Sequence, residues 1–167
     1  MKLKNLFNKP PDIDQLKASK DVQGLIKAFY YYAKDVTVSQ RAALALSELG
    51  PGTIDALLVP LADQDVNVAT LAWNSIMAMG RAATDELIRC YETGVSSGNA
   101  ARILAAMADP RATEALMSCL YSLHDIQLRQ LAAEALGQIG SDQAIEALMR
   151  RLRSEDNSQA HQTLVQA

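Results

Sequence analysis

The side chains best suited to chemistry in this sequence are two cysteines and two histidines. Cys90 and Cys119 each lie within a helical pattern of apolar residues, where a thiol is usually buried and reduced. His124 and His161 have no spacing to a cysteine or a carboxylate that suits a metal ion. We therefore expect no disulfide, no metal site and no cofactor.

Two pairs of neighbouring carboxylates are the other candidates for catalysis. Asp12 and Asp14 form one pair, and Asp85 and Glu86 form the other. Each pair stands where a helix is predicted to begin, and negative charge there is favourable because of the helix dipole. We interpret them as solvated helix-start charges rather than an acid and a base. The sequence therefore predicts a non-enzymatic protein.

These side chains are carried by a repeat that is the clearest pattern in the sequence. An alanine, an aliphatic residue four positions later, another three positions later and usually a closing glycine recur four times. The quartets are Ala42/Leu46/Leu49/Gly50, Ala72/Ile76/Met79/Gly80, Ala100/Leu104/Met107/Ala108 and Ala132/Leu136/Ile139/Gly140. Their second members are spaced by 30, 28 and 32 residues. This period is typical of a solenoid, in which each unit buries its apolar face against its neighbours.

Each unit is predicted to be a pair of helices. The quartets mark the second helix of each pair, over residues 38–49, 68–79, 98–107 and 127–139. Helix 22–33 is the first helix of the opening pair, and apolar stripes after each closing residue predict the other first helices. The third unit lacks the usual Asp-Val turn, so we expect its second helix to be shorter. The prediction is an all-α fold of about five pairs, with residues 20–167 as the repeat domain.

The two ends of the chain are predicted to cover the array. Residues 1–19 form an N-terminal capping segment, although three lysines among its first eleven residues also suit anionic lipid or a partner. At the other end, a turn at Asp156 precedes a second helix over 158–167 that would complete a fifth pair. Tyr30, Tyr31 and Tyr32 span most of a helix circumference, so one of them should face solvent.

Composition limits the partners that the protein can bind. The chain has 167 residues, a net charge of −3 and a pI near 5.3. A nucleic-acid partner is therefore not expected, because phosphate binding needs a surplus of Lys and Arg on one face. No secretory signal and no apolar run long enough to span a membrane is visible, which predicts a cytoplasmic protein. The oligomeric state is left open.

Two segments carry a resemblance to a known family. Residues 128–140, LRQLAAEALGQIG, and residues 41–50, RAALALSELG, resemble the HEAT repeat in its short prokaryotic form, the phycobilisome-lyase HEAT-like repeat. The resemblance implies a right-handed α-α superhelix whose second helices line the concave side, and a protein-binding role. Some members attach or detach bilin chromophores. A bilin-lyase-like or other regulatory subunit of an enzyme complex is therefore the alternative function.

If the second helices line an inner groove, the residues opposite their buried stripe face a ligand. The candidate binding residues are Gln40, Leu44, Thr70, Trp73, Asn74, Met77, Arg102, Gln130 and Glu134. This surface is neutral and partly apolar, which favours a peptide or protein partner. Ala105 is expected on the same surface.

Trp73 stands out within this set. It is the only tryptophan in the sequence, and the other units have Ala43, Ala101 and Ala133 at its position. Tryptophan is favoured at binding hot spots because it offers a large rigid surface and one hydrogen-bond donor. Two interpretations stay open: an anchor for a partner, or a filler of space beside the irregular third unit.

Overall fold

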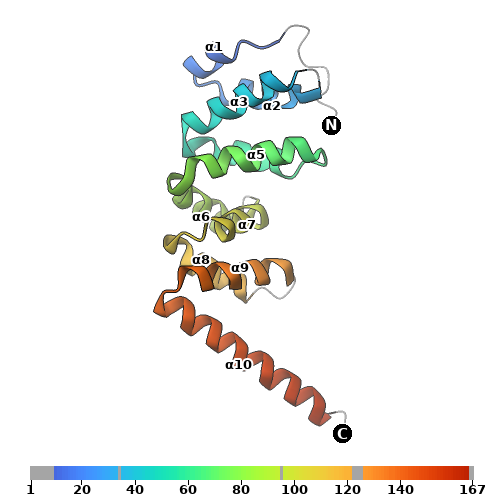
Figure 1. Ribbon diagram of the computed structural model, residues 1–167, viewed down its shortest axis with the longest axis vertical. Coiled ribbons are helices and arrows are strands. Elements are labelled where there is room, and N and C mark those ends of the chain that lie inside the picture. Colours follow the sequence, from blue (N-terminus) through green and yellow to red (C-terminus); the bar gives the residue numbers. More distant parts are fainter. Residues whose placement is uncertain (1–9, 34, 95, 122–125, 166–167) are drawn as a thin grey trace.

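The computed structural model describes residues 10–33, 35–94, 96–121 and 126–165, with the backbone alone at 32, 33 and 155–165. In this part of the chain, helices follow one another in pairs stacked along one axis (Figure 1). The first helices are α2 (Val22–Phe29), α4 (Ile54–Leu61), α6 (Thr84–Thr93) and α8 (Thr113–Leu120). The second helices are α3 (Val36–Leu49), α5 (Val66–Met79), α7 (Ser97–Met107) and α9 (Ile126–Ile139). Units 1 to 4 are these pairs in chain order.

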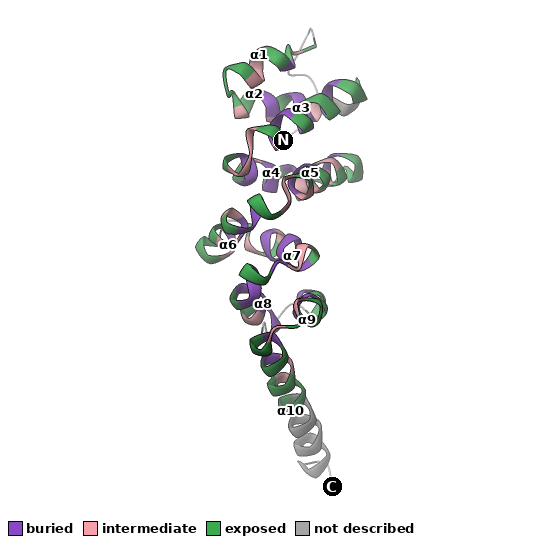
Figure 2. Cartoon of the chain, turned by 60° about the vertical axis from the view of Figure 1, so that its left-hand side comes forward, coloured by how far each residue is buried: buried purple, intermediate pink, exposed green. Residues whose placement is uncertain are grey.

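The helices form two layers, with the first helices in one and the second helices in the other (Figure 2). The core lies between the layers and follows the sequence repeat. Leu46, Ile76, Leu104 and Leu136 occupy one repeat position, and the exposed fraction of each is 0%. Each unit thus buries an equivalent side chain against its neighbours, which confirms the predicted all-α solenoid.

The ends of the second helices follow the sequence signals. Asp35 and Asp65 precede α3 and α5, and their side chains accept hydrogen bonds from the backbone N–H groups of Thr37 and Asn67. Gly50, Gly80 and Gly140 follow α3, α5 and α9 with φ angles of 86°, 55° and 62°. A side chain is strained in this conformation, so the closing glycines end these helices.

Unit 3 departs from its neighbours at both ends of its second helix. α7 has 11 residues, whereas α3, α5 and α9 have 14 each, which confirms the predicted shortening. Ser96, before α7, has a φ of 49° and no side-chain capping hydrogen bond. Ala108 closes the unit at φ 46° in the place of a glycine. Unit 3 therefore lacks the first turn of its second helix and ends in a left-handed alanine.

The predicted turn at Asp156 is wrong. α10 (Asp142–Val165) is one continuous helix of 24 residues that passes through this position and extends away from the stack (Figure 1). Residues 150–160 contain no glycine or proline, so no residue there opposes helix formation strongly. An ion pair between Arg150 and Glu146, at 2.6 Å, adds local support. Within the described residues, which reach position 165, the fifth unit therefore has no separate second helix.

The N-terminal part of the described chain packs on unit 1. The short helix α1 (Ile13–Ala18) begins at Asp12, whose side chain accepts a hydrogen bond from the Gln15 N–H. Ile13 is 3% exposed and joins the core. Ion pairs join Lys17 to Glu48 of α3 and Asp14 to Arg41 of α3. Residues 1–9, to which much of the predicted cap belongs, lie outside the described residues.

Two residues of the tyrosine cluster pack partly against the core. Tyr30 and Tyr31 lie in the 3-10 helix η1 (Tyr30–Ala33), and both are half-buried against the core. Burial raises the pKa of Tyr30, and the nearby Asp63 carboxylate raises it further. The side chain of Tyr32 is outside the described part. None of the described helices is both long enough and apolar enough to cross a membrane.

Candidate functional site

Successive second helices meet at interfaces that differ along the array. The α3–α5 and α7–α9 pairs pack closely, whereas α5 and α7 make little contact. At the close interfaces the residue seven positions before each closing residue is an alanine, and it is covered. Ala43 of α3 is 5% exposed and Ala101 of α7 is 0% exposed. The α5–α7 interface is the exception.

Trp73 occupies this position on α5 and stays half-buried. It lines an opening of about 330 Å³, here called the central cleft, whose walls are Leu61, Ala69, Thr70, Trp73, Asn99 and Arg102. Leu61 ends α4, the next three residues belong to α5, and Asn99 and Arg102 belong to α7. The cleft thus lies between units 2 and 3.

Two features of the sequence account for the cleft. The missing first turn of α7 removes the segment that would cover Ala69 and Thr70 on α5. The indole of Trp73 also replaces the methyl group found at this position elsewhere, so α7 cannot approach as closely. An apolar floor bordered by a hydroxyl, an amide and a guanidinium group results.

The structure brings three of the nine predicted site residues together: Thr70, Trp73 and Arg102. Asn74 is exposed and Met77 half-buried on the same helix, while Gln40 and Leu44 are exposed on α3. Gln130 and Glu134 are exposed on α9, in unit 4.

The prediction for Ala105 is wrong. This alanine is 6% exposed, because α9 packs closely on α7. Leu61, Ala69 and Asn99 also line the cleft, although they are not among the predicted site residues. Leu61 and Ala69 occupy repeat positions that face the next unit, which is the signal that could have found them. Asn99 depends on the placement of α7, which no local pattern gives.

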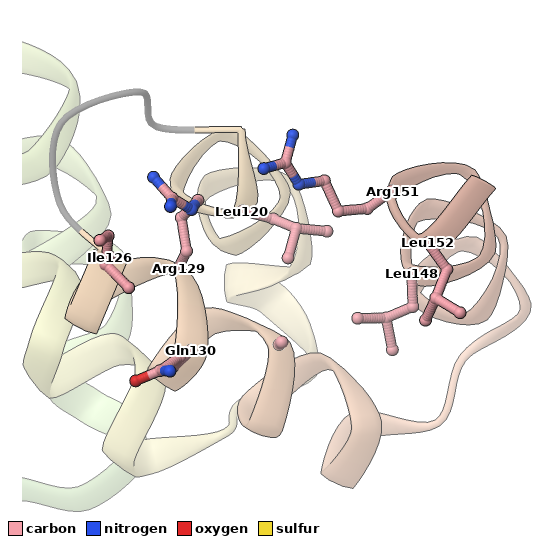
Figure 3. Close-up of a pocket in the computed structure, with 8 residues that line it drawn as sticks. Leu120, Ile126, Arg129, Gln130, Leu148, Arg151 and Leu152 are labelled. Atoms are coloured by element: carbon pink, nitrogen blue, oxygen red, sulfur yellow. The ribbon is translucent and has the colours of Figure 1, made fainter. Parts of the chain in front are cut away.

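A second opening has equivalent walls at the other end of the array. It measures about 280 Å³ and is called the terminal groove; its walls are Leu120, Ile126, Arg129, Gln130, Ala133, Leu148, Arg151 and Leu152. Arg129, Gln130 and Ala133 of α9 stand at the repeat positions of Ala69, Thr70 and Trp73 on α5. Figure 3 shows Leu148 pointing into this groove from α10, with Arg129 and Arg151 on one rim.

On the layer of first helices, units 2 and 3 are joined by a polar cluster. Arg89 of α6 pairs with Asp55 of α4 at 2.7 Å and with Glu86 at 2.6 Å. The buried Cys90 thiol donates a hydrogen bond to Asp55 Oδ1 at 2.8 Å. The pKa of Asp55 is lowered, and this hydrogen bond is the largest cause.

The thiol, Asp55 and Glu86 also have the proximity of a metal-ligand set, because their ligand atoms lie within 4.8 Å of one another. Two facts oppose that use. The Arg89 guanidinium already pairs with both carboxylates. Burial, followed by the hydrogen bond to Asp55, raises the pKa of Cys90 to about 12, whereas a metal binds the thiolate. The cluster is better explained as a link between α4 and α6.

Units 3 and 4 are joined by a more buried carboxylate. Asp109 is 4% exposed and accepts a hydrogen bond from the Thr84 hydroxyl at 2.9 Å. Arg111 pairs with Asp109 at 2.8 Å and with Asp85 at 2.9 Å. The hydrogen bond from Arg111 is the largest of the causes that lower the pKa of Asp109 to about 2.

Comparison with known proteins supports the repeat assignment. Residues 97–167 match the family model for HEAT repeats, and this stretch contains α7, α8, α9 and α10. A search of curated proteins gave no match. Units 1 and 2 repeat the helical pairs of the matched region, with equivalent buried residues. Residues 97–167 therefore carry HEAT repeats, and units 1 and 2 share their architecture.

Proposed function

We propose that this chain is a non-enzymatic binding scaffold whose central cleft holds part of a peptide or a protein surface. HEAT repeats generally act as scaffolds for protein interactions. A solenoid suits this role because its stacked units present a long, rigid surface.

The observation that carries the proposal is the position of Trp73. A half-buried tryptophan in a preformed cleft gives a partner a large rigid contact area at little entropic cost. Thr70, Asn99 and Arg102 line the same cleft and offer polar groups that can fix the orientation of the bound chain. A volume of about 330 Å³ is at the low end for ligand sites, which suits one or two side chains of a polypeptide.

The exposed residues of neighbouring second helices extend this surface in the proposal. Leu44, 59% exposed on α3, offers an apolar contact on one side of the cleft. Gln130 and Glu134 offer polar contacts on α9, on the other side. A peptide crossing the second helices would meet apolar groups near α3 and α5 and polar groups near α9.

The test is selection of peptides from a displayed random library on the folded protein, followed by calorimetric titration of a selected peptide. Trp73→Ala should weaken binding at least tenfold, which corresponds to about 1.4 kcal/mol. Val59→Ala is the matched control, because Val59 is 63% exposed on α4 and lies outside the cleft. It should leave the affinity unchanged.

Equal affinities of the Trp73→Ala and Val59→Ala proteins would place binding elsewhere and overturn the proposal. A parallel titration with a free bilin addresses the alternative function. Saturable uptake of the bilin that is lost in Trp73→Ala, with no peptide selected, would favour the chromophore-handling role instead.

A further inference from the structure

The terminal groove has the form of an empty place for one more second helix. In the earlier units each second helix packs against the first helix of its own pair, and α5 and α9 also pack closely on the previous second helix. The terminal groove is bordered in the same way, by the second helix α9 and the first helix α10. Among the described elements, no second helix follows α9 to fill this place.

Comparison of α10 with α8 shows which side chains lack their cover. Leu152 on α10 corresponds in the repeat to Leu120 on α8, and the exposed fractions are 63% and 3%. Ile145 corresponds to Thr113, with 50% against 6%. α10 is itself held on the array, because Tyr121 donates a hydrogen bond to the Ala147 carbonyl and Ala144 and Ala147 are buried. A well-anchored helix therefore presents an uncovered apolar face.

The sequence that follows this face has the pattern of a second helix. Ala160 and Leu164 have the spacing of Ala42 and Leu46, or of Ala132 and Leu136. Residues 154–167 contain Glu155 and Asp156 and no Lys or Arg. Two arginines, Arg129 and Arg151, are among the described residues that line the terminal groove, so the segment and the groove carry groups of opposite charge.

The continuous α10 keeps this segment away from the groove of its own chain. A straight helix rises about 1.5 Å per residue, so Ala160 lies about 12 Å beyond Leu152 along the axis. The segment would have to turn back to cover Leu148 and Leu152, and α10 has no such turn. A second copy can supply the segment without a turn.

We propose that two copies of this chain exchange the C-terminal halves of α10, each filling the terminal groove of the other. The exchange is reciprocal, so one two-fold axis relates the copies and both grooves are closed. Successive second helices run in the same direction, so the start of the exchanged segment meets the Arg129 and Arg151 rim. Glu155 and Asp156 would then face these arginines.

The first experiment measures the molar mass of the full chain by light scattering over a range of concentrations. The proposal predicts a dimer that Leu152→Glu converts to a folded monomer. Val59→Glu is the matched control, since Val59 is also 63% exposed, and it should stay dimeric. A wild-type monomer at all concentrations, or a dimer that Leu152→Glu leaves intact, would overturn the proposal.

The second experiment identifies which copy fills the groove. In the double variant Gln130→Cys/Ser158→Cys, the new thiols stand at equivalent heights on α9 and on the exchanged segment, while the native cysteines are buried. Mild oxidation should give covalent dimers, and so should a mixture of the two single variants. A disulfide within one chain would show that the segment folds back on its own unit, and a failure to form any disulfide in the dimer would place the interface elsewhere. Either result contradicts the exchange.

Discussion

The α3–α5 and α5–α7 interfaces are built from the same repeat and differ in what stands at one position. Ala43 on α3 is covered by the next helix, while Trp73 on α5 is half-buried beside the central cleft. The α3–α5 interface is closed at Ala43, whereas the α5–α7 interface is open beside Trp73. One large residue and the loss of one helical turn thus open a cleft between two units of a regular repeat.

The largest effect is expected when a tryptophan is placed at the equivalent position of the closely packed α3–α5 interface. Ala43→Trp should destabilise the fold by about 3 kcal/mol, because the close packing of α3 on α5 has no space for an indole. The check is urea unfolding followed by circular dichroism. Leu44→Trp, on the exposed neighbour, should change the free energy of unfolding little. Equal effects at the two positions would show that the interface is not closed at Ala43.

A smaller change in stability is expected at the boundary between units 3 and 4, where Asp109 is buried. Asp109→Asn should lower the free energy of unfolding by about 2 kcal/mol, because it weakens the hydrogen bonds that the buried Asp109 carboxylate accepts from Arg111 and Thr84. Asp85→Asn is the control, since Asp85 also pairs with Arg111 but is 77% exposed at its side chain. It should cost much less. Similar losses in the two variants would contradict the role given to Asp109.

The same carboxylate predicts a pH dependence. The pKa of Asp109 is lowered to about 2 in the folded protein, below the value of about 3.9 expected in the unfolded chain. Its contribution is therefore present above about pH 4 and is lost as the pH falls toward 2. Wild-type and Asp109→Asn proteins should converge in stability over this interval. A constant difference between them from pH 6 to pH 2 would be inconsistent with this assignment.

The smallest change in stability is expected at Ala108, which ends unit 3. Ala108→Gly should stabilise the fold by about 0.5 kcal/mol, because Ala108 has a φ of 46° and glycine adopts this conformation without strain. Gly80→Ala, at φ 55°, should destabilise the fold by about 1 kcal/mol. Thermal unfolding of both variants measures the pair. A loss of stability in Ala108→Gly would contradict the strain argument.

The ends of the second helices could be predicted from the sequence because neighbouring residues determine them. The predicted second helices end at Leu49, Met79, Met107 and Ile139, as in the structure, since glycine or left-handed alanine follows each. The turn at Asp156 failed because an aspartate alone does not end a helix when glycine and proline are absent.

The cleft was predicted only in part, for a related reason. Trp73 was identified by its break in the repeat, but its neighbours depend on where α7 lies. That placement results from packing between units 2 and 3, which spacing along the chain does not encode. Asn99 lines the cleft in the folded structure, but no pattern in the sequence predicts this.

The most direct test of the central claim is quenching of Trp73 fluorescence by acrylamide, with and without a bound peptide. Trp73 is the only tryptophan in the sequence, so the signal reports on the central cleft alone. We expect intermediate quenching in the free protein and a clear decrease when the peptide binds. Unchanged quenching in the peptide complex would show that the central cleft is not where the partner binds.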